Sequence, residues 1–307
     1  MPKHSNTLEK LLAAHARKID QLLQSTIAER AGGDTPKRLC DAMNYAATNG
    51  GKRLRPFLVS QTAAMLGRQD QGVLMAGAAL ECIHSYSLVH DDLPAMDNDD
   101  LRRGKPTTHK AYDEATAILV GDALQTLGFE LLSDEIIHVD PAKRLILIQE
   151  LAKASGAAGM VGGQLLDLAA EGRFDGARPV QSEPSIRAMQ AMKTGALLRF
   201  ACVAGAELAD ASPHDIDTMR QFGEIIGLAF QLADDILDRT GSAASLGKSA
   251  GKDEAAGKAT LVDFLGLEQA KVHLDKQVKA AHAILDGYGS DADILKQTAS
   301  FIAHRLS

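Results

Sequence analysis

Two long apolar stretches of the chain each run directly into a cluster of aspartates. Residues 73–90 are followed by the motif DDLPAMD at 91–97, and residues 219–233 are followed by DDILD at 234–238. Apolar stretches of this length predict helices that are buried on all sides. Carboxylates at the end of such a helix face the negative end of its dipole, and desolvation and mutual repulsion also oppose their charge. A hard divalent cation would offset all three costs, so the clusters predict a metal site.

Each acidic cluster also has a simpler interpretation. Acidic helix ends are often just solvated, and the aspartates near residues 97–100 could cap the element that follows them. The second cluster favours the metal, because Asp234 and Asp238 are four residues apart and share one helix face. Like charges at that spacing destabilise a helix unless something lies between them.

Basic residues indicate what such a metal would hold. The segment GGKRLRP at 50–56 places three cations beside a Gly-Gly pair, and Pro56 suits the first position of a helix. Arg102 and Arg103 follow the first acidic cluster in a stretch too rich in Gly and Pro to be helical. Lys193 interrupts an apolar run, where an unpaired ammonium is costly. Mg²⁺ prefers one or two carboxylates together with phosphate oxygens and water, so this combination predicts a diphosphate site.

His84 lies two helical turns before Asp91. The two side chains should therefore project from nearly the same face, about 10 Å apart. A lone histidine in an apolar helix is usually a hydrogen-bonded core residue. Here we expect it to line the same cavity as the acidic end of the helix.

The composition predicts an all-α protein. Apolar residues make up 45% of the chain, Ala and Leu recur at helical spacing, and strand-like alternation is rare. No linker divides the sequence, so we expect one domain, residues 1–307, formed by ten or more helices. Loops are expected near 31–36, 67–71, 172–184 and 241–259, and the last two are candidate lids.

Several classes of protein are disfavoured by the sequence. A net charge of −7 and the absence of Trp argue against nucleic-acid binding. The three cysteines are scattered without disulfide or metal spacing, which suits a reducing compartment. The start of the chain carries no secretory apolar segment, and Asp122 interrupts the longest candidate for a membrane span, 115–129. We expect a soluble, cytoplasmic protein that does not span a membrane.

Five motifs together resemble one family, the trans head-to-tail isoprenyl diphosphate synthases. In order they are GGKRLRP, ECIHSYSLVHDDLPAMDNDDLRRGKPTTH, GMVGGQLLDLAAEG, MKTGALL and FQLADDILD, and the match runs from about residue 39 to 267. The resemblance implies an all-α bundle around a central cavity and a homodimer. It also implies condensation of isopentenyl diphosphate with dimethylallyl and geranyl diphosphate, to give (2E,6E)-farnesyl diphosphate.

The same resemblance implies a role for individual residues. Three Mg²⁺ ions, with Mn²⁺ as an alternative, would be bound by Asp91, Asp97 and Asp234. The carboxylates expected to support them are Asp92, Asp235 and Asp238, with Gln164 and Asp167 as further supporting groups. The cations expected to hold the allylic diphosphate are Arg102, Lys193 and Lys258, and Lys248 is a further residue expected to bind substrate. Those expected to hold isopentenyl diphosphate are Lys52, Arg55, His84 and Arg103, while Thr194 and Gln231 would flank the carbocation. The catalytic set would be Asp91, Asp97, Asp234, Arg102 and Lys193.

Product length is the finest property that the resemblance addresses. Tyr86 lies five positions before the first aspartate, and two extra residues widen the motif. Tyr86 and Ser87 would therefore limit the product to fifteen carbons. The alternative for Tyr86 is a buried aromatic whose hydroxyl is satisfied. Helix geometry does not decide, because five residues place Tyr86 about 140° from Asp91.

Other activities remain open from the sequence. The first is synthesis of the twenty-carbon or ten-carbon diphosphate. The others are a terpene cyclase or head-to-head synthase, and a non-catalytic subunit of a partner synthase. A cyclase needs only one diphosphate site, and the presence of both GGKRLRP and the Arg102-Arg103 pair argues against it. A non-catalytic subunit usually lacks some of these aspartates or arginines.

Overall fold

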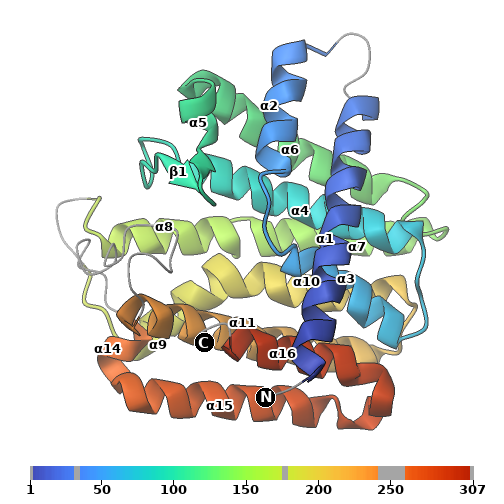
Figure 1. Ribbon diagram of the computed structural model, residues 1–307, viewed down its shortest axis with the longest axis vertical. Helices are drawn as coiled ribbons and strands as arrows, with labels where there is room; N and C mark the ends of the chain where they lie inside the picture. The colour runs from blue at the N-terminus through green and yellow to red at the C-terminus, as the bar shows by residue number, and fades with distance from the viewer. Residues whose placement is uncertain (1–2, 31–34, 175–178, 241–259, 305–307) are drawn as a thin grey trace. The chain divides into compact units, whose positions relative to one another are not determined.

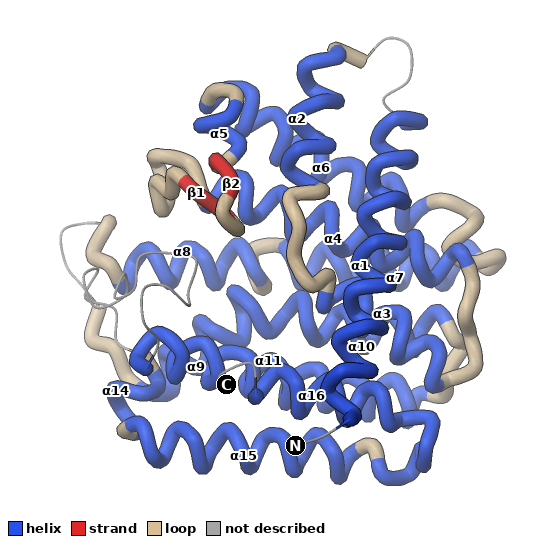
Figure 2. The backbone as a smooth tube through the Cα atoms, in the orientation of Figure 1, coloured by secondary structure: helices blue, strands red, loops and turns tan. Residues whose placement is uncertain are grey.

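The computed structural model describes residues 3–30, 35–174, 179–240 and 260–304. The described residues are almost entirely helical, and the two short strands among them form one hairpin (Figure 2). The prediction of an all-α protein is confirmed. The chain forms two compact units, which are described separately below. Unit 1 comprises Met1–Ser60 and Arg68–Ile148, and unit 2 comprises Gln61–Gly67 and Gln149–Ser307. The single-domain organisation stays a prediction.

Unit 1 is built around the apolar helix α4 (Gln71–Asp91). Asp70 caps its first turn by accepting a bond of 3.0 Å from the Val73 N–H, and Asp92 follows its last residue. The helix packs against α1 (Lys3–Arg30), α2 (Lys37–Ala47) and α6 (Glu114–Ser133) (Figure 1). Between α4 and α6 lie the hairpin, β1 (Leu101–Arg102) with β2 (Lys105–Pro106), and the short helix α5 (Thr108–Ala111). The helices α3 (Leu54–Met65) and α7 (Pro141–Ser155) contribute residues to both units.

Unit 2 is organised by the long helix α11 (Pro213–Thr240), which packs against α10 (Ala196–Leu208), α15 (Leu267–Ile284) and α16 (Asp293–His304). Helix α8 (Met160–Ala170) and helix α9 (Glu183–Gln190) precede a π-helical turn, η1 (Ala191–Gly195), that leads into α10 (Figure 1). The short helix α14 (Leu261–Leu265) and the 3₁₀ segment η2 (Asp286–Ala292) flank α15. The second acidic cluster therefore lies within the last two turns of the described part of α11.

The two apolar stretches differ in how they are buried. Helix α4 is buried on nearly all sides, as predicted for the first stretch. The prediction was wrong for the second, because Gln221 and Glu224 of α11 are exposed. The polar residues within this stretch recur on one side, so α11 is amphipathic and buries only the opposite face.

Predicted segment boundaries agree with the structure in part. Residues 35–36 and 67–70 are non-helical as expected, as are the described residues 172–174 and 179–182, whereas Gln71 already belongs to α4. Helix α9 begins at Glu183, so Pro184 belongs to a helix rather than to the loop. Helix α3 begins at Leu54, so Pro56 lies in its first turn but not at its first position. The predicted loop and candidate lid at 241–259 lies outside the described residues.

Helices α4 and α6 are long and apolar enough to cross a membrane by length and composition. Helix α6 meets this criterion although Asp122 interrupts its apolar run, because one or two charged residues do not exclude a helix from it. In α4, 78% of the apolar window is buried within the protein, against 50% in α6. Core helices of soluble proteins meet the same criterion, so the two helices are weak evidence for a membrane span.

Candidate active site

The first acidic cluster folds as a compact turn at the end of α4. The Asp97 N–H donates to the Asp91 carbonyl at 2.8 Å, and the Asp99 N–H donates to the Asp92 carbonyl at 3.2 Å. These bonds bring Asp91 and Asp97 into one turn, where both side chains are half-buried. The strand β1 follows directly after Asp100, so these aspartates do not cap a helix.

Arg102 is bound to the second aspartate of the same cluster. Its Nε lies 2.7 Å from Asp92 Oδ1 and 2.9 Å from Oδ2, and its Nη2 lies 2.5 Å from Oδ1. Asp99 Oδ2 is a further 3.8 Å neighbour of Nη2. Such a forked, charge-assisted contact fixes both side chains. The hairpin therefore holds Arg102 beside the acidic turn, and Asp92 is buried and already neutralised.

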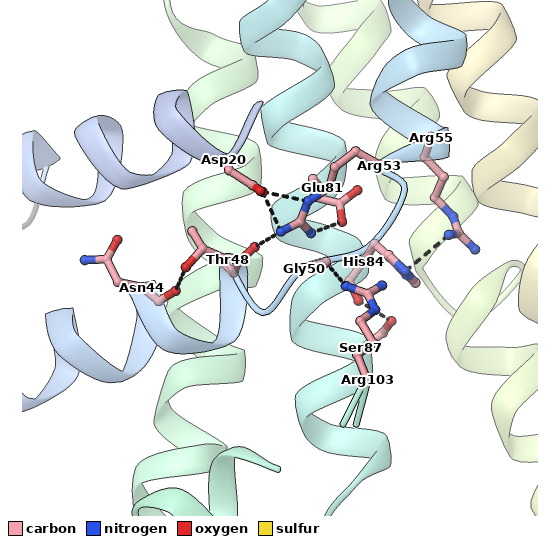
Figure 3. Close-up of polar contacts among 11 residues, drawn as sticks. Asp20, Asn44, Thr48, Gly50, Arg53, Arg55, Glu81, His84, Ser87 and Arg103 are labelled. Carbon is pink, nitrogen blue, oxygen red and sulfur yellow. Dashed lines mark hydrogen bonds and ion pairs between the residues drawn. The ribbon is translucent and has the colours of Figure 1, made fainter. Parts of the chain in front are cut away.

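A second group of basic residues includes Arg103, in the turn of the hairpin, and Arg55, in the first turn of α3. Arg103 Nη1 donates to the Gly50 carbonyl, and Arg55 Nη1 lies 3.2 Å from His84 Nε2 (Figure 3). Gly51 has φ +113°, and a Cβ there would lie 2.5 Å from Arg103 Nη1. A glycine at this position is thus what allows the Arg103 guanidinium to approach the loop.

His84 is uncharged at neutral pH. Burial is the main cause that holds its pKa well below the usual value, and Arg55, Arg103, Arg53 and Arg102 lower it further. A neutral ring that accepts from Arg55 at Nε2 carries its proton on Nδ1. The Ser87 hydroxyl donates to the His84 carbonyl at 2.8 Å. Of the four residues expected to hold isopentenyl diphosphate, the structure brings together Arg55, His84 and Arg103, while Lys52 is exposed.

Arg53, the middle cation of GGKRLRP, is not among the residues that the sequence predicts to bind substrate. Its side chain is buried and bound to Asp20 and Glu81 (Figure 3). The sequence does contain one indication that a buried cation lies nearby, because Glu81 is a carboxylate inside the apolar stretch that forms α4. A buried carboxylate requires a partner.

Tyr86 is 5% exposed and makes an edge-on ring contact with His90, with centroids 5.9 Å apart. Its hydroxyl is buried and has no hydrogen-bond partner among the described residues. Burial raises its pKa. The alternative interpretation, a buried aromatic with a satisfied hydroxyl, is therefore wrong with respect to the hydroxyl.

In unit 2 the ammonium of Lys193 has the partner that its apolar surroundings demand. Lys193 Nζ lies 2.6 Å from Oδ2 of the buried Asp167 on α8. A Cβ at Gly163, one turn before Asp167, would lie 2.2 Å from the Lys193 backbone nitrogen. The motif GMVGGQLLD thus supplies the glycine that lets α8 approach the Lys193 backbone closely and the aspartate that pairs with its ammonium. The lysine itself lies in the π-helical turn η1, a type of distortion found often at functional sites.

The second acidic cluster divides into buried and accessible carboxylates. Asp235 is buried and accepts from the Leu261 N–H at 2.9 Å and from Gln190 Nε2 at 3.2 Å. Asp234 is half-buried and Asp238 is exposed. Thr194, Gln164 and Gln231 are also half-buried. The expected ligands Lys248 and Lys258 lie outside the described residues.

Among the described residues, no group of three or more His, Cys, Asp or Glu side chains is arranged to enclose a metal ion. Mg²⁺ does not require such an arrangement, because it commonly uses one or two carboxylates with phosphate oxygens and water. Asp91 and Asp97 share one turn and remain partly accessible, as does Asp234. The turn that carries Asp91 and Asp97 fits a hard cation that is shared with a phosphate, and Asp234, described by itself, offers one carboxylate of the same kind.

Comparison with known proteins gives the family. The polyprenyl synthetase family model matches residues 36–299. The chain is 45% identical to the farnesyl diphosphate synthase of Escherichia coli over 299 residues, covering 96% of this chain and 97% of that protein. It is 42% identical to the farnesyl diphosphate synthase of Bacillus subtilis over 302 residues, covering 98% and 99%. The crystal structure of an FPP/GFPP synthase from Zymomonas mobilis matches with a TM-score of 0.86 and 46% identity, covering 97% of this chain and 99% of that one.

The chain belongs to the polyprenyl synthetase family. It is therefore a prenyltransferase, and the resemblance stated from its motifs is confirmed. Members of this family bind diphosphate with the help of a divalent metal, which agrees with the donor set described above.

Proposed function

We propose that this chain condenses isopentenyl diphosphate with dimethylallyl diphosphate and then with geranyl diphosphate, to give (2E,6E)-farnesyl diphosphate. The observation that carries the proposal is the full-length likeness to two proteins named farnesyl diphosphate synthase. The Arg55–His84–Arg103 group supports it, because a second diphosphate site is what a condensing enzyme needs and a cyclase does not.

The acidic residues would act on the allylic substrate. Asp91 and Asp97 would hold two Mg²⁺ ions and Asp234 a third. The bound ions would neutralise the allylic diphosphate and stabilise it as it leaves. Lys193, fixed by Asp167 at 2.6 Å, and Arg102 would bind phosphate oxygens. Because both cations already have fixed orientations, little reorganisation is needed when charge develops on the leaving group.

The basic group of unit 1 would hold the second substrate. Arg55, His84, Arg103 and Lys52 would bind the diphosphate of isopentenyl diphosphate. A neutral His84 with its proton on Nδ1 can accept from Arg55 and keep that guanidinium oriented. The double bond of isopentenyl diphosphate would then attack the allylic carbocation, forming the new carbon–carbon bond. Loss of a proton to the departed diphosphate completes the product, while Thr194 and Gln231 would flank the cation.

Tyr86 and Ser87 would limit the product to fifteen carbons. The buried, unpartnered Tyr86 hydroxyl supports a ring that lines a space rather than one that is fixed by a polar contact. The twenty-carbon product is the second candidate. A geranylgeranyl pyrophosphate synthase of Arabidopsis thaliana is 42% identical over 88% of this chain and favours that alternative.

We further propose a cytoplasmic homodimer. Helix α6 exposes Ile118 and Leu119, which are 46% and 58% accessible and lie outside its packed face. A second copy of the chain would cover this apolar surface. Sedimentation of the purified protein tests the proposal. Leu119→Glu should shift it to the monomer, and a wild-type chain that sediments as a monomer would contradict the dimer.

The test of function is an assay of the purified chain with dimethylallyl diphosphate, isopentenyl diphosphate and Mg²⁺, with products sized by chromatography. A fifteen-carbon diphosphate is expected. Asp234→Asn should lower turnover by orders of magnitude, because it removes charge stabilisation of the transition state. Asp217→Asn is the matched control, since Asp217 is an exposed carboxylate on the same helix that bonds Gln221. A cyclic product would indicate a terpene cyclase, and no product would indicate a regulatory subunit.

A further inference from the structure

We propose that Arg53 is a positioning residue for the isopentenyl diphosphate site: it binds no substrate, and it sets the conformation in which Arg55 reaches His84. The inference rests on the proposed function, because it assigns a role within that site. Arg53 is the one cation of GGKRLRP that has no part in the proposed reaction.

Arg53 is bound by its whole guanidinium to three separate parts of unit 1. Its Nε and Nη2 lie 2.8 and 2.7 Å from Asp20 Oδ1 on α1, and its Nη1 lies 2.5 Å from Glu81 Oε1 on α4. Nη2 also donates to the carbonyl of Ala47, the last residue of α2, at 2.6 Å. The Arg53 side chain is 1% exposed and that of Glu81 is 2% exposed. A guanidinium so fully committed cannot also bind a phosphate.

The backbone of the loop needs such an anchor. Gly50 and Gly51 have φ +80° and +113°, and Arg53 itself has φ +48°. A non-glycine residue in this region is strained and is held there only by its surroundings. The contacts of the Arg53 side chain are the evident compensation. Releasing them would let residues 50–55 relax to other conformations.

The anchor acts directly on the proposed substrate ligands. Glu81 and His84 are three residues apart on α4, so they lie one turn apart on the same face. Arg53 reaches Glu81, and Arg55, in the first turn of α3, reaches His84, so the segment 53–55 is fixed to α4 at two successive turns (Figure 3). The first contact is buried and the second is part-buried. Arg53 therefore sets the register in which Arg55 meets His84.

The charges around Arg53 also suit this role. Asp20 and Glu81 neutralise Arg53, whereas Arg55 and Arg103 contact a neutral ring and a carbonyl. Glu81 also offsets the repulsion between Arg53 and Arg103, whose pKa is lowered mainly by burial. Asp20 and Glu81 thus bind Arg53, while the neighbouring Arg55 and Arg103 remain directed to other groups. Breaking a buried pair of this kind by removing one partner is strongly disruptive.

Arg53→Lys tests the proposal, because lysine keeps the charge but cannot span two carboxylates and a carbonyl. Arg68→Lys is the matched control. Arg68 also joins a carboxylate, Asp70 at 2.7 Å, to a backbone carbonyl, Ile137 at 2.7 Å, elsewhere in unit 1. Michaelis constants for isopentenyl and geranyl diphosphate, turnover and melting temperature are measured for the wild type and both variants. Arg53→Lys should raise the constant for isopentenyl diphosphate about ten-fold or more, with that for geranyl diphosphate within about two-fold. Arg68→Lys should lower the melting temperature and change neither constant.

A readout without turnover separates this proposal from the proposed function. In protein labelled at histidine, the His84 ring signals should shift in Arg53→Lys and not in Arg68→Lys, because only the first releases Arg55 from His84. A wild-type chain without condensing activity would refute the proposed function and leave this measurement intact. Unchanged His84 signals would overturn the positioning role, as would equal changes in both Michaelis constants. If Arg53→Lys does not fold, Glu81→Gln, which preserves the shape of the partner, replaces it with the same expectations.

Discussion

The contact between Gly163 and Lys193 makes Gly163→Ala the sharpest test of how the lysine is positioned. A Cβ at residue 163 would lie 2.2 Å from the Lys193 nitrogen, 2.6 Å from its Cα and 2.8 Å from the Met192 carbonyl carbon. All three are backbone atoms of the π-helical turn, so no side-chain rotation can relieve the overlap. Either α8 or the turn must move, and Lys193 Nζ then leaves its 2.6 Å contact with Asp167.

The expected loss of stability follows from two opposing effects. Overpacking in a well-packed interior costs about 1–3 kcal/mol, and an obstacle made of backbone places this case at the upper end. Replacing glycine by alanine inside a helix gains roughly 0.5–1 kcal/mol. The net change is a loss of about 2 kcal/mol in the free energy of unfolding. Displacement of Lys193 by about 1 Å should also lower turnover by up to about a hundred-fold.

Urea unfolding and steady-state turnover measure both effects, and Gly195→Ala is the control within the same turn. A Cβ at residue 195 would meet its nearest neighbour, the Gln190 carbonyl, at 3.7 Å, which is an ordinary contact. Gly195→Ala should therefore be neutral or slightly stabilising. A Gly163→Ala variant as stable and active as Gly195→Ala would refute the idea that this close approach holds the lysine in place.

Three further predictions concern other parts of the chain. Tyr86→Ala should extend the product beyond fifteen carbons and cost about 3–5 kcal/mol of stability. Tyr86→Phe should leave both the product length and the stability unchanged. A fifteen-carbon product from folded Tyr86→Ala would place the length determinant elsewhere. Calorimetry should show much weaker binding of dimethylallyl diphosphate in EDTA than in Mg²⁺. Without the metal, each close pair of negative charges on the aspartates and the diphosphate repels by several kcal/mol even at an effective dielectric of about 20. Equal affinities would contradict the metal bridge. Burial, and to a lesser extent Lys18, lowers the pKa of His15 to about 4. In the unfolded chain His15 takes up a proton at the ordinary histidine pKa of about 6.5, whereas in the folded chain it stays neutral until a lower pH. The free energy of unfolding should therefore fall by roughly 2–3 kcal/mol between pH 7 and about pH 4.5. Urea unfolding of His15→Gln should show a loss smaller by that amount, and an equal loss would contradict the assignment.

The parts of the site that the sequence predicts are those encoded by local pattern. The apolar run before Asp91 predicts a buried helix, and α4 is one. A lysine inside an apolar run predicts a buried partner, and Lys193 has Asp167. In both cases the energetic demand is visible in the residue and its neighbours in sequence.

Features that depend on contacts between distant segments are not visible in the same way. The burial of Arg53 requires carboxylates from α1 and α4, and nothing in GGKRLRP distinguishes this arginine from Arg55. The π-helical turn at Ala191–Gly195 is equally hidden, because one extra residue in a turn leaves the apolar pattern nearly unchanged. In residues 219–233 the polar side chains are few, and only their positions around the helix show that α11 is amphipathic.

The hairpin that carries Arg102 and Arg103 has a consequence for how enzymes of this kind can diverge. Arg102 contacts the Asp92 carboxylate, and the next residue, Arg103, contacts the Gly50 carbonyl. The Tyr45 hydroxyl also donates a hydrogen bond to the Pro106 carbonyl of the hairpin. An inherited change in its turn, for example at Gly104 with φ +77°, would alter both contacts at once. Under the proposed roles of the two arginines, a change in this turn would alter the affinity for both substrates together. Variation in substrate preference should accumulate instead on helices such as α4, where single side chains can change independently.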